Sequence, residues 1–154
     1  MKVFVDTSVM FPLVSEGDPE HDRAGRIVRA VAETPHEFVS TNYVVVECLS
    51  LLQRRQGMAA AARFLDYVKA HVTVVWMDDA RHAEALRAWG RAGQRDLSIV
   101  DCSSFLVMRE QGIHAALAFD RHFLAAGFHL PGESPGPQVR EPRTRYRASR
   151  RKSP

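Results

Sequence analysis

The amino-acid sequence predicts a single α/β domain with a central parallel sheet flanked by helices. Short runs made only of apolar residues, such as Val3-Phe4-Val5, recur along the chain. Runs of this kind are typical of strands that are covered on both faces. Segments with apolar residues at helical spacing separate these runs. Helices between strands favour parallel pairing, because each return to the sheet needs a crossover connection.

The first half of the chain begins with a β-rich run and an Asp-Thr-Ser sequence that can cap a helix. Pro12 would kink that helix near its end or stop it, because proline lacks the backbone N–H group. A strongly apolar helix later in this half ends at Gly57. In chain order, the expected elements are a strand over 2–5, a helix over 7–14, a helix over 20–32, a strand over 38–40 and a helix over 41–56.

The second half of the chain shows the same alternation of helices and strands. One continuous apolar run predicts a strand buried on both faces, and Gly112 stops a helix before the last strand. In chain order, the expected elements are a helix over 59–70, a strand over 72–77, a helix over 79–92, a helix over 98–111, a strand over 115–119 and a short helix over 121–126.

Length and composition restrict the class of protein. A chain of 154 residues, 45% of them hydrophobic, is long enough for one domain that buries roughly two thirds of its unfolded surface. No apolar run approaches about 18 residues and no charged-then-apolar leader is present, so we expect a cytoplasmic protein without a membrane segment. Cys48 and Cys102 lie in apolar segments without CxxC spacing, which favours reduced core thiols over a disulfide or a zinc site.

Positive charge is concentrated at the C-terminus. Residues 140–154 contain seven Lys and Arg and one Glu, a net charge of +6, which leaves −3 for the rest of a chain whose total is +3. Proline and glycine at 131–137 cannot continue a helix or strand, so we expect a domain over 1–130 and a mobile linker and basic tail over 131–154. The positive charge of the tail is suited to binding RNA phosphates. A tail that is only solvated and adds solubility is an equal alternative. Its RNA-binding candidates are Arg143, Arg145, Arg147, Arg150, Arg151 and Lys152.

Four acidic side chains stand where a core residue, or the first residue after a core strand, is expected: Asp6, Glu47, Asp101 and Asp120. An unpaired buried carboxylate costs several kcal/mol, so such a fold must neutralise these groups. No Lys or Arg lies within three residues of Asp6, Glu47 or Asp101. Asp6 and Asp120 follow expected strands, and ligands bind at the carboxyl ends of strands in open α/β sheets. The pattern therefore predicts an oxygen-rich site suited to Mg²⁺ or Mn²⁺.

Three of these acids also have a structural interpretation. Asp6 and Asp120 could each cap the helix that follows, and Ser98-x-x-Asp101 fits a capping box. Glu47 resists this interpretation, because it lies past the first turn of its helix on a largely apolar stripe. A functional role is therefore favoured most strongly for Glu47.

The motifs that contain these acids, read in order, resemble those of PIN-domain ribonucleases, and in particular the VapC-like toxins of bacterial toxin–antitoxin pairs. The matching segments are residues 3–8, 42–47, 96–102 and 118–123, and the resemblance spans residues 2–130. It implies a compact PIN-like α/β domain with a central parallel sheet, a Mg²⁺ or Mn²⁺ site, RNA as substrate, a homodimer, and inhibition by a cognate antitoxin. Asp96 matches an additional acid of this branch, and an ion pair with the neighbouring Arg95 is an equal alternative.

The residue types suggest a division of roles. Hydrolysis of a phosphodiester needs an activated water and positive charge on the phosphate oxygens, and bound metal supplies both. We expect Asp6 and Asp101 to bind the metal, with Glu47 and Asp120 holding a second ion or orienting the water. Hydroxyls of Thr7 or Ser8 would hold Asp6 or a phosphate oxygen. The expected products carry 5′-phosphate and 3′-hydroxyl ends, and His122 is interpreted as flanking structure rather than a catalytic base.

Two other function classes compete with this hypothesis. A phosphatase with an aspartyl nucleophile would place a second Asp two residues after Asp6, but Ser8 occupies that position. A non-catalytic module with a PIN-like fold that holds RNA or a partner protein is compatible with the sequence, and a cleavage assay with and without chelator separates it from a nuclease.

Overall fold

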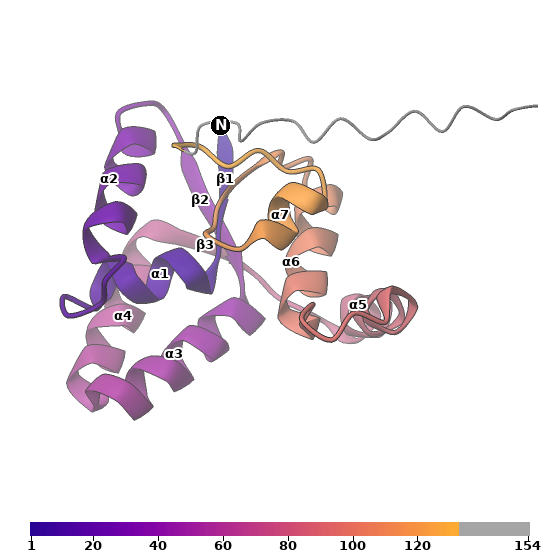
Figure 1. The fold of residues 1–154 in the computed structure, drawn as a ribbon, viewed down its shortest axis with the longest axis horizontal. Coiled ribbons are helices and arrows are strands. Elements are labelled where there is room, and N and C mark those ends of the chain that lie inside the picture. The colour runs from indigo at the N-terminus through magenta and orange to yellow at the C-terminus, as the bar shows by residue number, and fades with distance from the viewer. Residues whose placement is uncertain (133–154) are drawn as a thin grey trace, which may run out of the picture.

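A computed structural model describes residues 1–132 of the chain. Its centre is a parallel sheet of four strands in the order β3-β2-β1-β4 (Figure 1). The strands are β1 (Lys2–Val5), β2 (Glu37–Thr41), β3 (Val72–Val75) and β4 (Ala115–Leu117). The predicted central parallel sheet is thereby confirmed. The expected linker and tail lie outside the described residues from residue 133 onward, as do Arg143, Arg145, Arg147, Arg150, Arg151 and Lys152.

Helices flank this sheet. They are α1 (Thr7–Val14), α2 (His21–Ala32), α3 (Asn42–Gln56), α4 (Met58–His71), α5 (Asp79–Ala92), α6 (Ile99–Glu110) and α7 (Arg121–Ala125). The chain moves outward from β1 to β2 and β3, and then returns to β4 on the other side of β1. Right-handed crossovers therefore place α5 and α6 opposite α1 to α4, as Figure 1 shows. The strand order reverses between β1 and β4, which is where ligands bind in open α/β sheets.

One strand differs from the sequence-based expectation. The predicted buried strand over 72–77 ends at Val75, and its side chains are partly exposed because β3 is an edge strand paired only with β2. Trp76 is 69% exposed directly after it. Pro12 lies near the end of α1, which spans Thr7–Val14 as expected. Its missing N–H leaves only the carbonyl four residues earlier without a helical partner, a loss that a short helix tolerates.

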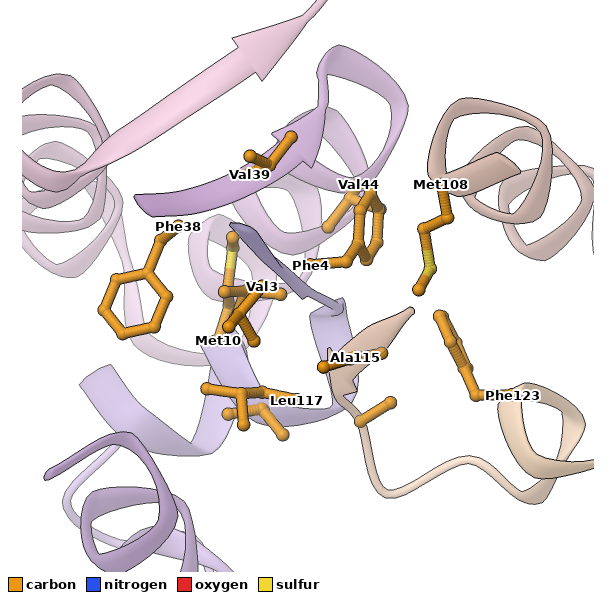
Figure 2. Close-up of a cluster of buried hydrophobic side chains, with 14 of the residues drawn as sticks. Val3, Phe4, Met10, Phe38, Val39, Val44, Met108, Ala115, Leu117 and Phe123 are labelled. Atoms are coloured by element: carbon orange, nitrogen blue, oxygen red, sulfur yellow. The ribbon is translucent and has the colours of Figure 1, made fainter. Parts of the chain in front are cut away.

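The hydrophobic core holds the elements around the ends of β1 and β4. Figure 2 shows Phe4, Met108 and Phe123, which come from β1, α6 and α7, gathered in one buried cluster. The Phe123 ring packs edge-on against Phe105, with 5.0 Å between ring centroids. Burial of Phe123 fixes the short helix α7, and with it Asp120 at the start of that helix. Within residues 1–132, no helix is long and apolar enough to span a membrane.

Candidate active site

The predicted acids gather near the point where the strand order reverses. The backbone N–H of Asp6 donates to the Leu117 carbonyl at 3.0 Å, so the pairing of β1 with β4 continues to Asp6 itself. Because β4 ends at Leu117 rather than at residue 119, Asp120 follows its strand by three residues instead of one. The intervening loop brings Asp120 to the start of α7. The expectation that Asp120 directly closes a strand was therefore wrong.

Asp6 is fixed by the helix that it begins. Its Oδ2 accepts hydrogen bonds from the Ser8 N–H at 2.9 Å and from the Ser8 hydroxyl at 2.6 Å. The Ser8 Oγ in turn accepts from the Phe119 N–H at 2.9 Å. Ser8 thus connects Asp6 to the loop that carries Asp120, and the expected supporting contact between Ser8 and Asp6 is present. The Asp6 side chain is almost fully buried, with 5% of the residue exposed.

Burial raises the pKa of Asp6 from its ordinary value of 3.8 to about 6. The two hydrogen bonds from Ser8 oppose this change, whereas the charges of Asp101 and Glu47 add to it. The pKa of the Cys48 thiol is also raised, to about 12. Burial is the largest cause, and the charges of Asp6 and Glu47 add to it. Asp6, Glu47 and Asp101 therefore share one electrostatic environment that disfavours further negative charge. Both Cys48 and Cys102 are free and buried, as expected of core thiols.

Glu47 reaches this environment from the first half of α3. Its Oε2 accepts a hydrogen bond from the Thr7 hydroxyl at 2.6 Å, across 40 positions of sequence. The sequence-based expectation was that a hydroxyl of Thr7 or Ser8 holds Asp6 or a phosphate oxygen, and Ser8 supplies that contact. Thr7 instead holds Glu47, because α1 packs against α3 and turns residue 7 toward that helix. The side chains at residues 7 and 8 therefore orient two different acids.

Asp101 occupies the capping box at the start of α6. Its Oδ2 accepts from the N–H and the hydroxyl of Ser98, both at 2.8 Å, and the Ser98 Oγ accepts from the Asp101 N–H at 3.0 Å. Asp101 is buried, with 8% of the residue exposed. The structural interpretation of Asp101 is thus present in the fold, as it is for Asp6 and Asp120, which each cap the following helix.

Each of the three capping carboxylates keeps one oxygen that its helix cap does not engage. Within residues 1–132, Oδ1 of Asp6, Oδ1 of Asp101 and Oδ2 of Asp120 accept no hydrogen bond, because each cap engages the other oxygen. In the same part of the chain no Lys or Arg forms an ion pair with Asp6, Glu47 or Asp101. Helix N-termini thus hold three acids in place, and an additional positive charge is needed to stabilise them together.

A second set of contacts surrounds Asp120. Its Oδ1 accepts from the His122 N–H at 2.9 Å and lies 2.7 Å from the His122 Nδ1. The other ring nitrogen, Nε2, lies 3.2 Å from Oδ2 of Asp96. Burial lowers the pKa of His122, but the nearby carboxylates of Asp120, Asp96 and Asp101 outweigh it, and the net direction is upward. The exposed Asp96 therefore contacts His122, a residue that sequence reasoning placed outside the site.

The donor atoms of Asp101, Asp120 and His122 all lie within 4.8 Å of one another. This spacing fits a divalent metal ion, which carboxylate oxygen and imidazole nitrogen can both bind. Asp6 interacts electrostatically with Asp101 and Glu47. Among residues 1–132, however, neither Asp6 nor Glu47 joins this close group. The only sequence signal for His122 was its position two residues after Asp120, which places both at the start of α7.

The sequence as a whole matches a family model described as the PIN domain over residues 3–129. The chain belongs to the PIN-domain family. The PIN domain is also 39% identical over 133 residues to a 23S rRNA-specific endonuclease, VapC20, of Mycobacterium tuberculosis strain CDC 1551 / Oshkosh. The match covers 82% of this chain and 95% of the relative. VapC20 of strain H37Rv matches to the same extent. The predicted resemblance to VapC-like toxins is confirmed.

Solved structures agree with this assignment. The crystal structure of Mycobacterium tuberculosis VapC20, described as a Sarcin-Ricin loop cleaving toxin, superposes with a TM-score of 0.74 and 36% identity. The match covers 82% of this PIN domain chain and 96% of that one. Rickettsia felis VapBC2 bound to a promoter DNA fragment gives a TM-score of 0.62 at 10% identity, covering 84% and 97% of the chains. The second match shows a shared fold alone.

Proposed function

We propose that this PIN domain is a metal-dependent endoribonuclease that hydrolyses RNA phosphodiesters, and that it is the toxin of a toxin–antitoxin pair that inhibits translation. The observation that carries the proposal is 39% identity to a 23S rRNA-specific endonuclease over 95% of that relative. The site supports it, because its buried acids are held by helix caps and lack a basic partner within residues 1–132. Ribosomal RNA is the substrate class to test first.

The proposed roles follow from the contacts of each side chain. Asp6 and Asp101 would hold Mg²⁺ or Mn²⁺ through the oxygens that their caps leave unused, and Glu47 and Asp120 would hold a second ion or orient the attacking water. The bound ion would supply an activated water and positive charge on the phosphate oxygens. Thr7 and Ser8 keep Glu47 and Asp6 in place. The products would carry 5′-phosphate and 3′-hydroxyl ends.

The proposed partners are a cognate antitoxin and a second copy of the chain. One structural neighbour is a VapBC2 complex bound to DNA from its promoter. We extend the antitoxin to this chain because it shares 39% identity with a VapC protein. We also propose a cytoplasmic location, because the proposed substrate is an RNA of the translation machinery.

The test of the proposed function is a cleavage assay on purified 23S rRNA. We expect the full-length protein to cut the RNA in Mg²⁺ or Mn²⁺, to stop when a chelator is added, and to resume when excess metal is restored. Sequencing of the new ends would locate the cut and identify the terminal phosphate. A protein that binds the RNA but leaves it intact in every metal would support the alternative, a non-catalytic module with a PIN-like fold.

We further propose that the basic tail binds RNA phosphates. The proposal rests on its charge, since residues 140–154 carry +6. Deleting residues 140–154 is expected to weaken RNA binding and to flatten its salt dependence by about 0.7 in log–log slope for each single-strand phosphate that the tail neutralises. Cleavage at saturating RNA should survive the deletion. An unchanged slope would contradict the proposal and favour a solvated tail, and a truncated protein that no longer retains a co-purified antitoxin would assign the charge to that partner.

A further inference from the structure

His122 holds an unusual position beside the acids. Its ring lies between two carboxylates, with Nδ1 at 2.7 Å from Oδ1 of Asp120 and Nε2 at 3.2 Å from Oδ2 of Asp96. The first pair is close but poorly aligned for a hydrogen bond, so Nδ1 is a buried polar atom without a hydrogen-bond partner. This holds although 21% of the His122 side chain is exposed. A buried polar atom without a hydrogen-bond partner is rare. If the ring is neutral with its proton on Nε2, the Nδ1 lone pair faces a carboxylate oxygen at 2.7 Å, and a cation between the two atoms would relieve that repulsion.

The spacing of the donors around Nδ1 suits a metal ion. In an octahedral site with bonds of about 2.1 Å, neighbouring donors are about 3.0 Å apart and opposite donors about 4.2 Å apart. The donor atoms of Asp101, Asp120 and His122 lie within 4.8 Å of one another, and the closest approach between Asp120 and His122 is 2.7 Å. Small movements of the carboxylates would therefore place three donors around one ion.

The second ring nitrogen supplies an independent observation. A histidine that binds metal through one nitrogen usually donates its other N–H to a carboxylate, which fixes the tautomer and orients the ring. Asp96 occupies that place, since its Oδ2 lies 3.2 Å from Nε2. With the proton on Nε2, the lone pair of Nδ1 is available on the side of Asp101 and Asp120. The arrangement is then a chain from Asp96 through His122 to the ion.

We propose that His122 is a direct metal ligand through Nδ1, together with Asp101 and Asp120, and that Asp96 is the residue that positions it. Mg²⁺ is a hard cation that takes oxygen ligands, whereas imidazole nitrogen suits first-row transition metals. This position therefore favours a transition-metal cation such as Mn²⁺ over Mg²⁺. The inference rests on the proposed function only in assuming that the site binds a divalent cation.

The test is pulsed electron paramagnetic resonance of Mn²⁺ bound to the full-length protein. Wild type is expected to show hyperfine coupling from one directly bound nitrogen, and labelling of histidine with ¹⁵N should change that coupling. His122→Gln should abolish it. His114→Gln is the matched control, because His114 is an exposed histidine outside the site, and the coupling should persist there. Asp96→Asn should weaken Mn²⁺ binding by roughly 10- to 100-fold, the usual effect of losing such an outer carboxylate, and Mg²⁺ binding by less.

Specific results would overturn the inference. A wild-type spectrum without ¹⁵N-sensitive coupling, or a coupling that persists in His122→Gln, excludes His122 as a ligand even if a variant folds poorly, because the first comparison uses only wild type. Equal weakening of Mn²⁺ and Mg²⁺ in Asp96→Asn contradicts the preference for Mn²⁺. RNA cleavage in the same Mn²⁺ buffer separates the two proposals. Cleavage without nitrogen coupling refutes only the role of His122, whereas bound Mn²⁺ with intact RNA refutes the nuclease.

Discussion

Asp6→Asn is expected to abolish RNA cleavage by the purified protein and to relieve the growth arrest that expression of the wild type causes. Asparagine keeps the shape of the side chain and an oxygen that can accept both hydrogen bonds from Ser8, so the start of α1 should remain intact. The change removes the negative charge that would hold metal. We expect a loss of about 100-fold or more in cleavage rate, the scale seen when one group that stabilises transition-state charge is removed.

A matched control exists at another helix start. Asp78 caps α5 by accepting from the Arg81 N–H at 2.9 Å, as Asp6 caps α1, but its side chain is 63% exposed and it has no contact with the site acids. Asp78→Asn therefore makes the same chemical change outside the site and should leave cleavage unaltered. The measurement is the rate of 23S rRNA cleavage by both variants, together with growth after induction. Equal cleavage and equal toxicity of soluble wild type and Asp6→Asn would contradict the role of Asp6.

The sequence was sufficient to locate the acids but not to assign their partners. The helix caps of Asp6 and Asp101 could be predicted because each follows a local rule. Asp6 caps the helix after a strand, and Asp101 belongs to a Ser-x-x-Asp capping box. The contact of Thr7 with Glu47 spans 40 positions and depends on how α1 packs against α3. The local sequence pattern carries no information on contacts between residues so far apart in the chain. The partner of the Thr7 hydroxyl therefore could not be predicted from its neighbours in sequence.

The same reasoning explains why the contacts of His122 and the edge position of β3 were not predicted. The environment of His122 depends on Phe123, whose burial docks α7 against the core, and on Asp96, which lies 26 positions earlier. The apolar run at 72–77 correctly predicted a strand, but an apolar run does not distinguish an edge strand from a central one. Both features depend on placement in the tertiary structure, whereas the types and order of the elements follow from capping, spacing and strand propensity.

The metal-free protein is expected to lose stability as the pH rises through the pKa of Asp6. Burial raises that pKa from 3.8 to about 6 in the folded protein. An acid whose folded pKa is raised contributes its full stability below the unfolded pKa, and that contribution falls as pH rises through the folded value. The window is therefore about pH 4 to 7. A shift of about two units corresponds to on the order of 3 kcal/mol of unfolding free energy lost by neutral pH.

Asp6→Asn removes the contribution of Asp6 to this pH dependence and leaves the other titrating groups in place. In chelator, the variant should match wild type near pH 4, where Asp6 is protonated, and should exceed it above pH 7 by up to the same 3 kcal/mol or so, because asparagine cannot ionise. Metal should narrow this difference at neutral pH. It is expected to stabilise wild type by about 2.7 kcal/mol at one hundred times its dissociation constant, and the variant by much less because a ligand is missing.

Denaturant unfolding of wild type, Asp6→Asn and Asp78→Asn from pH 4 to 8, in chelator and in excess Mn²⁺, measures these differences directly. Asp78→Asn should follow the wild-type curve in shape, since Asp78 is exposed and asparagine keeps the cap while removing only a surface charge. If Asp6→Asn keeps the wild-type pH slope in chelator, the buried carboxylate is not the source of the instability. If it also gains as much from Mn²⁺ as wild type, Asp6 is a helix cap and not a metal ligand. A curve that lacks the wild-type fall between about pH 4 and 7, together with a lost metal response, requires both the burial and the ligand role, because a cap alone produces neither a fall of stability with rising pH nor a response to metal.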